Sequence, residues 1–198
     1  NSSLEGANRI HFQLAKTALS GGTDVALCDS NYNNVVTGFC MNTSSSSSGG
    51  WASSNMRTAF CGTSLSSYSG TIIAVIPAEL RAVLKSVTKY TNNTGNSTAA
   101  NAVTATTDYF FLLSEYEVFG STTKANKNEA SKQAQYSYYS AGNSIVKYNH
   151  SETSTSVMWW LRSPYPMGNG YFIYVSAYGK ASERYAHYSC GFAPGFCV

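Results

Sequence analysis

Charged residues are scarce in this sequence. Asp, Glu, Lys and Arg make up 12% of the 198 residues, about half the share of typical globular proteins. The net charge is only +3 and no block of Lys or Arg occurs, which argues against a surface that follows nucleic-acid phosphates. We therefore expect no nucleic-acid partner. The abundant Ser, Thr, Asn, Gly and Tyr predict a neutral, hydroxyl- and amide-rich surface, as suits extracellular or virion-exposed proteins.

Long apolar runs are also missing. No run reaches membrane-spanning length, so we expect no membrane insertion. The sequence has no initial Met and no signal-like apolar segment, from which we expect a fragment of a larger multidomain or oligomeric fibre protein. Its length suits one domain over residues 1–198, two small domains being the weaker alternative. A chain of this size buries roughly 70% of its extended-chain surface and can fold without disulfides or a bound metal.

The sequence lacks the spacings that hold metals. Its five cysteines form no CxxC pair and have no His at zinc-ligand spacing. They are Cys28, Cys40, Cys61, Cys190 and Cys197. We interpret them as free, mostly buried thiols; a Cys28–Cys40 disulfide remains an alternative. The aspartates do not follow calcium-loop spacing. We therefore expect no metal and no cofactor.

Catalytic motifs are equally sparse. The three histidines, His11, His150 and His187, are far apart and have no supporting motif. Glu115 and Glu117, two residues apart, would not share a helical face. We interpret them as one solvated carboxylate and one internal ion-pair partner, and we expect no enzyme.

Hydrophobic patterning predicts an α+β fold, loop-rich and with a mainly antiparallel sheet. Strands are expected at 10–15, 24–28, 35–40, 87–91 and within 103–113. Two short helices are expected at 51–60 and 78–85, the second with Pro77 in its first turn. Residues 114–120 are predicted to form a short helix or turn, and 127–139 a helix or loop. Residues 44–50 are predicted to form a Ser/Gly loop that is flexible by composition, and residues 92–101 an exposed loop.

The last forty residues have apolar ends and an aromatic, chemically mixed middle. They begin with Met158-Trp159-Trp160-Leu161-Arg162-Ser163-Pro164 and end with Gly191-Phe192-Ala193-Pro194-Gly195-Phe196-Cys197-Val198. Adjacent strand residues face opposite sides, so one Trp ring is expected in the core and the other on a second cluster. Arg162 is expected to be a structural hydrogen-bonding residue, with Asp108, Glu115 and Glu117 as candidate partners.

The segments 159–164 and 191–196, which we call the two boxes, resemble a family of gut-bacterial and phage domains, as do Phe172, Val175 and Gly179 between them. That family has the C-type lectin-like fold and is related to its formylglycine-generating-enzyme branch. The segments 50–57, 80–90 and 104–120 resemble it too, so the likeness covers most of the chain. Its members resemble the variable proteins of diversity-generating retroelements, in which adenine mutagenesis changes Asn codons near the C-terminus.

The resemblance implies a fixed frame and a variable ligand-binding region within 159–198. The frame is 159–164, Phe172, Val175, Gly179 and 191–196. The implied ligand-binding positions are Tyr165, Met167, Asn169, Tyr171, Ile173, Tyr174, Ser176, Tyr178, Ser182, Arg184, Tyr185, His187, Tyr188 and Cys190. Nearly all of these residue types are reachable from the usual Asn codons, Met167 being the exception.

The implied function is receptor binding or adhesion through a diversified surface, on a phage tail or a cell surface. The partner would be an unknown protein or glycan receptor on a cell surface. The alternatives are an oxidase of the formylglycine-generating type and a structural spacer of a tail fibre or adhesin. The calcium-binding signatures of sugar-binding lectins are absent, and Cys190 and Cys197 do not match the enzymes' cysteine pair.

Overall fold

The computed structural model describes residues 5–16 and 21–198. Its strands and helices have six residues or fewer and are joined by long loops. The strands are β1 (His11–Gln13), β2 (Val25–Ala26), β3 (Val87–Asn92), β4 (Val103–Asp108), β5 (Phe110–Phe111), β6 (Lys147–Asn149), β7 (Glu152–Val157), β8 (Trp159–Pro164), β9 (Tyr171–Val175), β10 (Ala181–Tyr185) and β11 (Gly195–Cys197). The helices are α2 (Gly50–Ser53), the π-helix η1 (Met56–Cys61), α3 (Ile72–Val75), α4 (Ala78–Val83), the 3-10 helices η2 (Ala100–Ala102) and η3 (Lys127–Lys132), α5 (Glu115–Phe119) and α6 (Ser137–Ser140). The predicted α+β class is confirmed.

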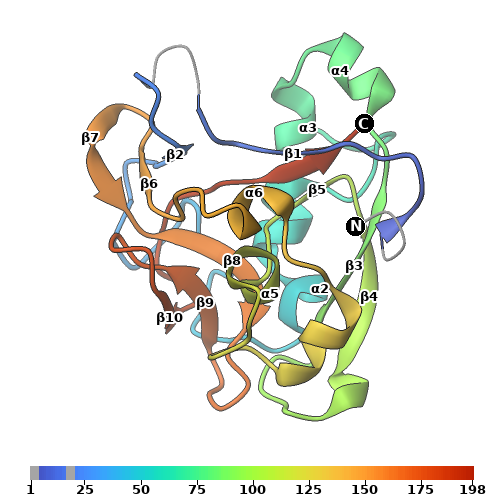
Figure 1. Ribbon diagram of the computed structural model, residues 1–198, viewed down its shortest axis with the longest axis vertical. Helices are drawn as coiled ribbons and strands as arrows, with labels where there is room; N and C mark the ends of the chain where they lie inside the picture. Colours follow the sequence, from blue (N-terminus) through green and yellow to red (C-terminus); the bar gives the residue numbers. More distant parts are fainter. Residues whose placement is uncertain (1–4, 17–20) are drawn as a thin grey trace.

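The strands form small sheets rather than one large one. Their orders are β1-β11-β5, β10-β9-β8, β2-β6-β7 and the β3-β4 ribbon. Each pairing between these strands is antiparallel except that of β2 with β6, which confirms the mainly antiparallel prediction. The first strand thus lies against the last, and Figure 1 shows β1 running beside the red β11.

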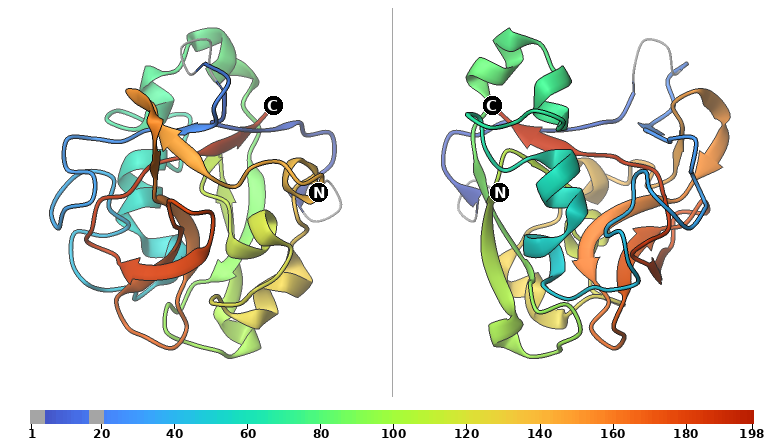
Figure 2. Two further views of the ribbon diagram at one scale, coloured as in Figure 1. Left: turned by 60° about the vertical axis from the view of Figure 1, so that its left-hand side comes forward. Right: turned by 180° about the vertical axis from the view of Figure 1, so that it is seen from behind.

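The β3-β4 ribbon and the β9-β10 hairpin lie on opposite sides of the body, as Figures 1 and 2 show. Strand β8 and helix α2 lie between them, and each contacts β3. One hydrophobic cluster fills this interior and draws on residues from Ala26 to Cys197. The C-terminal sheet is therefore seated directly on the core.

Both Trp159 and Trp160 belong to that single cluster, and neither is exposed. The Trp159 indole donates to the carbonyl of Ile145 (3.1 Å) and the Trp160 indole to that of Phe39 (2.8 Å). The expectation of a separate second cluster for one ring is wrong. The reason is that β8 is covered on both faces, so both directions from the strand lead into the interior.

The predicted strand at 35–40 does not form. Only the isolated bridges Val35–Tyr188 and Cys40–Ser189 occur there. The Asp29 carboxylate instead folds the segment into a loop, because it accepts hydrogen bonds from the backbone amides of Asn31 (2.8 Å) and Phe39 (2.5 Å). An Asp that binds nearby amides in this way competes with strand formation.

The two predicted helices are present with altered limits. The segment 51–60 is divided into α2 and η1 at Ser54, whose hydroxyl donates to the Trp51 carbonyl and accepts from the Arg57 amide. Pro77 precedes α4 as its N-cap. The extra short helices, such as α3 and α6, span single turns, which are too short to leave a clear 3.6-residue period.

A buried charge network joins α5, β3 and β8. Arg162 binds Glu117 through both terminal nitrogens, at 2.5 and 3.0 Å, and Lys89 donates to the same carboxylate at 2.9 Å. All three side chains are fully buried. Of the candidate partners for Arg162, the structure therefore selects Glu117. Arg162 and Lys89 hold the pKa of Glu117 below its usual value against the opposing effect of burial.

Glu117 also caps its own helix. Its carboxylate accepts from the Ser114 amide (2.9 Å), and the Ser114 hydroxyl accepts from the Glu117 amide (3.1 Å). This reciprocal capping box fixes the start of α5. The predicted short helix at 114–120 is thereby confirmed, and its cap is the residue that pairs with Arg162.

Glu115 is not the solvated carboxylate that we expected. It is fully buried and accepts hydrogen bonds from the backbone amides of Thr123 (3.0 Å), Lys124 (3.1 Å) and Ala125 (2.6 Å). A carboxylate can remain buried when several amides bind its oxygens. Asn92, predicted to begin an exposed loop, is likewise buried, and its side chain donates to the carbonyls of Gly95 and Ser97.

The five cysteines are free, as predicted, and all but the half-buried Cys28 are buried. Burial raises the pKa of Cys28 and Cys197 to about 12. These thiols are therefore protonated at neutral pH and pack as small apolar side chains.

Arg162→Met should destabilise the protein by about 3–5 kcal/mol, because it leaves Glu117 buried with Lys89 as its one remaining cation among the described residues. The control is Lys124→Met, which breaks the half-exposed Lys124–Glu183 pair and should cost about 0–1 kcal/mol. Urea unfolding of both variants measures the difference. Equal losses would show that the buried network does not organise the fold.

Candidate ligand-binding face

The C-terminal sheet ends in a hairpin that carries most of the predicted ligand-binding positions. Tyr185 pairs with Tyr171, and Arg184 with Phe172, at one end of β9 and β10. Ala181 pairs with Val175 at the other end, beside the turn. Because β10 is an edge strand, side chains at the Tyr171–Tyr185 end can contact further rings from the loop after β10.

Five rings meet at that end and form what we call the aromatic platform. Its members are Tyr165, Tyr171, Tyr185, His187 and Tyr188. Tyr171 and Tyr185 are stacked with centroids 4.2 Å apart, and Tyr165 lies edge-on to Tyr171 at 6.3 Å. His187 packs at 5.7 Å from Tyr185 and 5.1 Å from Tyr188. The rings thus form one continuous group drawn from three segments of the chain.

The platform is largely uncharged. A hydrogen bond with Tyr185 raises the pKa of the Tyr171 phenol, so that hydroxyl stays neutral at physiological pH. The Arg184 guanidinium lies 4.2 Å from the Tyr188 ring centroid and donates to the Asn33 side chain at 2.7 Å. Neutral hydroxyls on rigid rings beside one guanidinium suit contact with a polar surface through stacking and hydrogen bonds.

The loop at 31–40 supports the platform from behind. Backbone hydrogen bonds run from Asn33 to Ser189 (2.9 Å), from Ser189 to Asn34 (2.8 Å) and from Val36 to His187 (3.2 Å). Val35 and Val36 are 42% and 52% exposed, so they extend the face with apolar surface. Sequence patterns missed this contribution because the two segments are separated by about 150 residues of chain, and no local pattern reports such a contact.

A second support comes from the loop that Glu115 holds. It places Lys124 against β10, where its ammonium pairs with Glu183 at 2.9 Å. The bond to Glu183 raises the pKa of Lys124. Two residues to which the sequence assigned no role therefore connect this loop to the hairpin through a half-exposed ion pair. The nearest sequence signal was the Glu115 carboxylate, which we had expected to be solvated.

The remaining predicted positions lie outside the platform. Met167 (74% exposed) and Asn169 occupy the β8–β9 loop, and Tyr178 (87% exposed) occupies the β9–β10 turn with Ser176. Tyr174 and Ser182 form a half-buried pair on the hairpin, with the Tyr174 ring 6.3 Å from Trp160. Four strand residues separate the turn from the platform, roughly 13 Å at strand rise. The predicted positions thus form separate groups.

Ile173 and Cys190 are corrections to the predicted set. Both are fully buried in the core cluster, so neither side chain can touch a ligand in this structure. Ile173 faces inward although the neighbouring Tyr174 is half-exposed, because alternate strand residues point to opposite sides. Cys190 follows Ser189, whose hydroxyl binds Asp29, and together they anchor the platform loop.

The predicted frame is packed too closely to vary. A methyl group at Gly191 would lie 2.8 Å from the Met158 carbonyl and 2.9 Å from Ala26, and one at Gly195 would lie 2.8 Å from the Phe111 ring. Phe172, Val175, Phe192 and Ala193 are buried. The structure therefore separates a closely packed frame from exposed positions in the same forty residues.

Within residues 5–16 and 21–198, no group of three or more His, Cys, Asp or Glu side chains is arranged to hold a metal ion. Cys190 and Cys197 are separately buried free thiols. Burial raises the pKa of both. None of the helices in that part of the chain has the length and apolar character needed to cross a membrane.

Comparison with known proteins gives one match. A family model described as a domain of unknown function (DUF6273) matches residues 30–198, which include the frame, the platform and the supporting loop. No curated protein and no solved structure matches the chain.

Ile173→Ala should cost about 2–5 kcal/mol, because it opens a cavity beneath β9. Tyr178→Ala, at the exposed turn, should change stability by no more than about 0.5 kcal/mol. Urea unfolding at neutral pH compares the two. A small effect of Ile173→Ala would mean that this position tolerates variation and that Ile173 belongs among the displayed positions after all.

Proposed function

The chain belongs to the DUF6273 family, and we propose that it is a ligand-binding module that presents a diversified surface to a receptor. The observation that carries the proposal is the aromatic platform, five contacting rings set on a largely buried frame. Tyr-rich surfaces give large, rigid contact area at low entropic cost, as in antibody loops. The partner would be a protein or glycan on a cell surface, and the module would sit on a phage tail or cell surface.

We also propose that the fold is C-type lectin-like. The loop-rich α+β body with short antiparallel strands supports this assignment. The two boxes that carry the resemblance occupy β8 and the segment ending in β11, which bracket the hairpin. That placement is what a variable surface between fixed strands requires.

Binding is favoured over the two alternatives by specific observations. An oxidase of the formylglycine-generating type needs accessible paired thiols, whereas Cys190 and Cys197 are both buried and free. A structural spacer would not need five partly exposed rings in contact with one another at one end of a hairpin, since aromatic clusters at a surface mark interaction sites.

Diversification is tested by sequencing the same locus in sister isolates of the source. We expect substitutions at the exposed positions between Tyr165 and Tyr188 and at codons that contain adenine, with the frame from Gly191 to Phe196 unchanged. Changes spread evenly over the chain, or no changes in this interval, would contradict a diversified surface.

Binding is tested by removing the platform. The triple variant Tyr171→Ser, Tyr185→Ser and Tyr188→Ser should lose at least about tenfold in affinity for glycans or surface proteins that the parent binds on arrays, because aromatic anchors dominate interface energies. Tyr178→Ser, outside the platform, is the matched control and should bind as the parent does. Equal binding by parent and triple variant would refute the platform as the site, and so would failure of the parent to bind any array component.

A further inference from the structure

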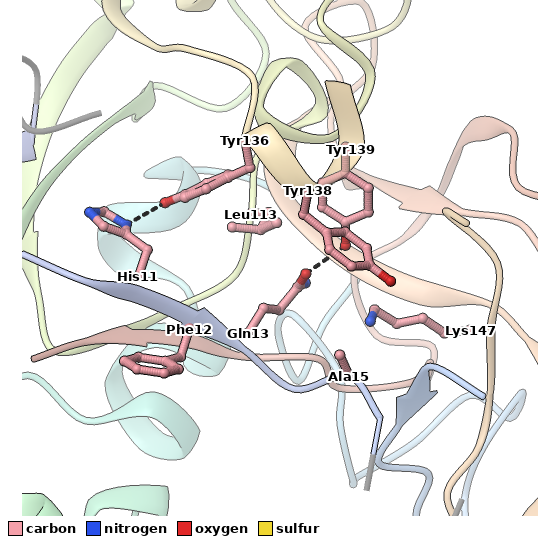
Figure 3. Close-up of a pocket in the computed structure, with 9 residues that line it drawn as sticks. All are labelled: His11, Phe12, Gln13, Ala15, Leu113, Tyr136, Tyr138, Tyr139 and Lys147. Atoms are coloured by element: carbon pink, nitrogen blue, oxygen red, sulfur yellow. Dashed lines mark hydrogen bonds between the residues drawn. The ribbon is translucent and has the colours of Figure 1, made fainter. Parts of the chain in front are cut away.

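A cavity of about 230 Å³ lies on the side of the molecule formed by β1, α6 and β6. Figure 3 shows the Tyr138 and Tyr139 rings on one side, Gln13 and Ala15 on the other, and Leu113 behind. Phe12 and Tyr138 are 44% and 40% exposed, so the cavity opens to the surface at its rim. None of its lining residues belongs to the aromatic platform.

Most polar groups of the lining already bind one another. The Tyr139 hydroxyl donates to the Gln13 side chain at 2.5 Å, and the Tyr138 hydroxyl donates to Asp24 at 2.5 Å. His11 Nδ1 lies 2.8 Å from the Tyr136 hydroxyl. Lys147 is the charged group of the lining that keeps unused hydrogen-bonding capacity.

Among the described residues, Lys147 is a buried cation without a counter-ion. It is 2% exposed, its ammonium lies 5.3 Å from the Trp159 ring centroid, and its one hydrogen bond to a described residue goes to the Leu14 carbonyl at 2.9 Å. All ten Asp and Glu residues of the chain lie in the described ranges, yet none is within ion-pair distance of Lys147. An ammonium has three donors, and a buried charge is costly unless it is paired.

The arrangement contrasts with the other buried cations. Arg162 and Lys89 both pair with Glu117, so their charges are satisfied within the fold. Lys147 differs because it reaches an open cavity, where Figure 3 shows its ammonium extending toward Gln13 and Tyr138. The missing negative charge can therefore come from a ligand.

We propose that this cavity binds a small carboxylic acid with one apolar ring, its carboxylate paired with Lys147 and its ring packed against Leu113 and the tyrosines. The volume supports one ring, since a cavity of about 150 Å³ accommodates benzene. The charge supports a monoanion. The other basic group in the lining, His11, has its pKa lowered to about 4 by burial and is neutral at pH 7.

The affinity should follow the protonation of Lys147. Burial lowers its pKa to about 8, opposed by the charge of Asp24. Below pH 8 the ammonium is present and pairs with the carboxylate. As pH rises through 8 the neutral amine replaces it, and affinity should fall by up to tenfold per pH unit.

The titratable groups beside Lys147 are Asp24, Tyr138 and Tyr139, while His11 lies further along the lining, against Tyr136. The pKa of Tyr138 is raised to about 12 by burial, and burial also raises that of Tyr139. With the pKa of His11 near 4, neither these phenols nor this imidazole changes charge between pH 6 and 9 in the unliganded protein. Glu5, whose carboxylate lies 3.2 Å from the His11 ring, does change charge in this range, because burial raises its pKa to about 7. A fall in affinity near pH 8 that is present in the parent and absent in Lys147→Met therefore reports Lys147.

The test is calorimetric titration of the purified chain at pH 7 with phenylacetate and, separately, with the neutral phenylacetamide. Phenylacetate should bind with a Kd of roughly 1 mM or tighter, which is reasonable for about ten heavy atoms. Phenylacetamide should bind at least about tenfold more weakly. Lys147→Met should lose this preference and bind the two probes equally.

Ala15→Phe is the second variant, because a ring at Ala15 would fill the cavity while leaving Lys147 in place. It should abolish binding of both probes, and thermal unfolding should confirm that both variants are folded. The proposal is overturned if phenylacetate does not bind the parent, if the amide binds equally well, or if Ala15→Phe retains the affinity. The outcome is independent of the platform, since Tyr171→Ser should leave phenylacetate binding unchanged.

Discussion

The ion pair between Arg162 and Glu117 is the interaction on which the rest of the structure depends. It joins residues 45 positions apart through two hydrogen bonds in a fully buried setting. Glu117 also caps α5 and binds Lys89 of β3, so one carboxylate holds together α5, the β3-β4 ribbon and strand β8 of the C-terminal sheet. Such a pair is costly to bury and more costly to break, which makes β8 a fixed reference for the hairpin of β9 and β10.

The segment that follows β8 contains two kinds of residue, those packed in the core and those available to a ligand. The frame residues fill the core or approach other backbone too closely for a side chain, as Gly191 does against Met158. The platform rings contact one another at one end of the hairpin, where each is at least partly exposed. Substitution of one of these rings leaves the buried frame residues in place, while the hairpin is held by its pairing with β8 and by the loop that Asp29 folds. This energetic separation is what a surface selected to vary would need.

The cavity beside Lys147 differs from the platform in how its charge is satisfied. Where Lys89 and Arg162 receive a carboxylate from the fold, Lys147 receives only a backbone carbonyl from the described residues. An unpaired buried charge is costly, and this cost keeps the charges around Glu117 paired. The same cost makes the cavity beside Lys147 selective for an anion. The platform suits a large partner and the cavity a small one, and the two share no residues.

Local structure could be predicted from sequence patterns without knowledge of the fold. Alternation predicted β1, the β-rich run at 87–91 predicted β3, Pro77 predicted the start of α4, and the Trp-Trp-Leu-Arg-Ser-Pro box predicted a buried element with a structural arginine. Tertiary packing decided which side chains are covered. It buried Ile173 and Cys190, brought Asn33 and Val35 to the platform, set Tyr178 apart from it, and surrounded Glu115 with amides. Periodicity reports conformation over a few residues, whereas burial and charge pairing depend on contacts between distant segments, such as Gln13 and Ala193, which are 180 residues apart. Those contacts exist only in the folded chain.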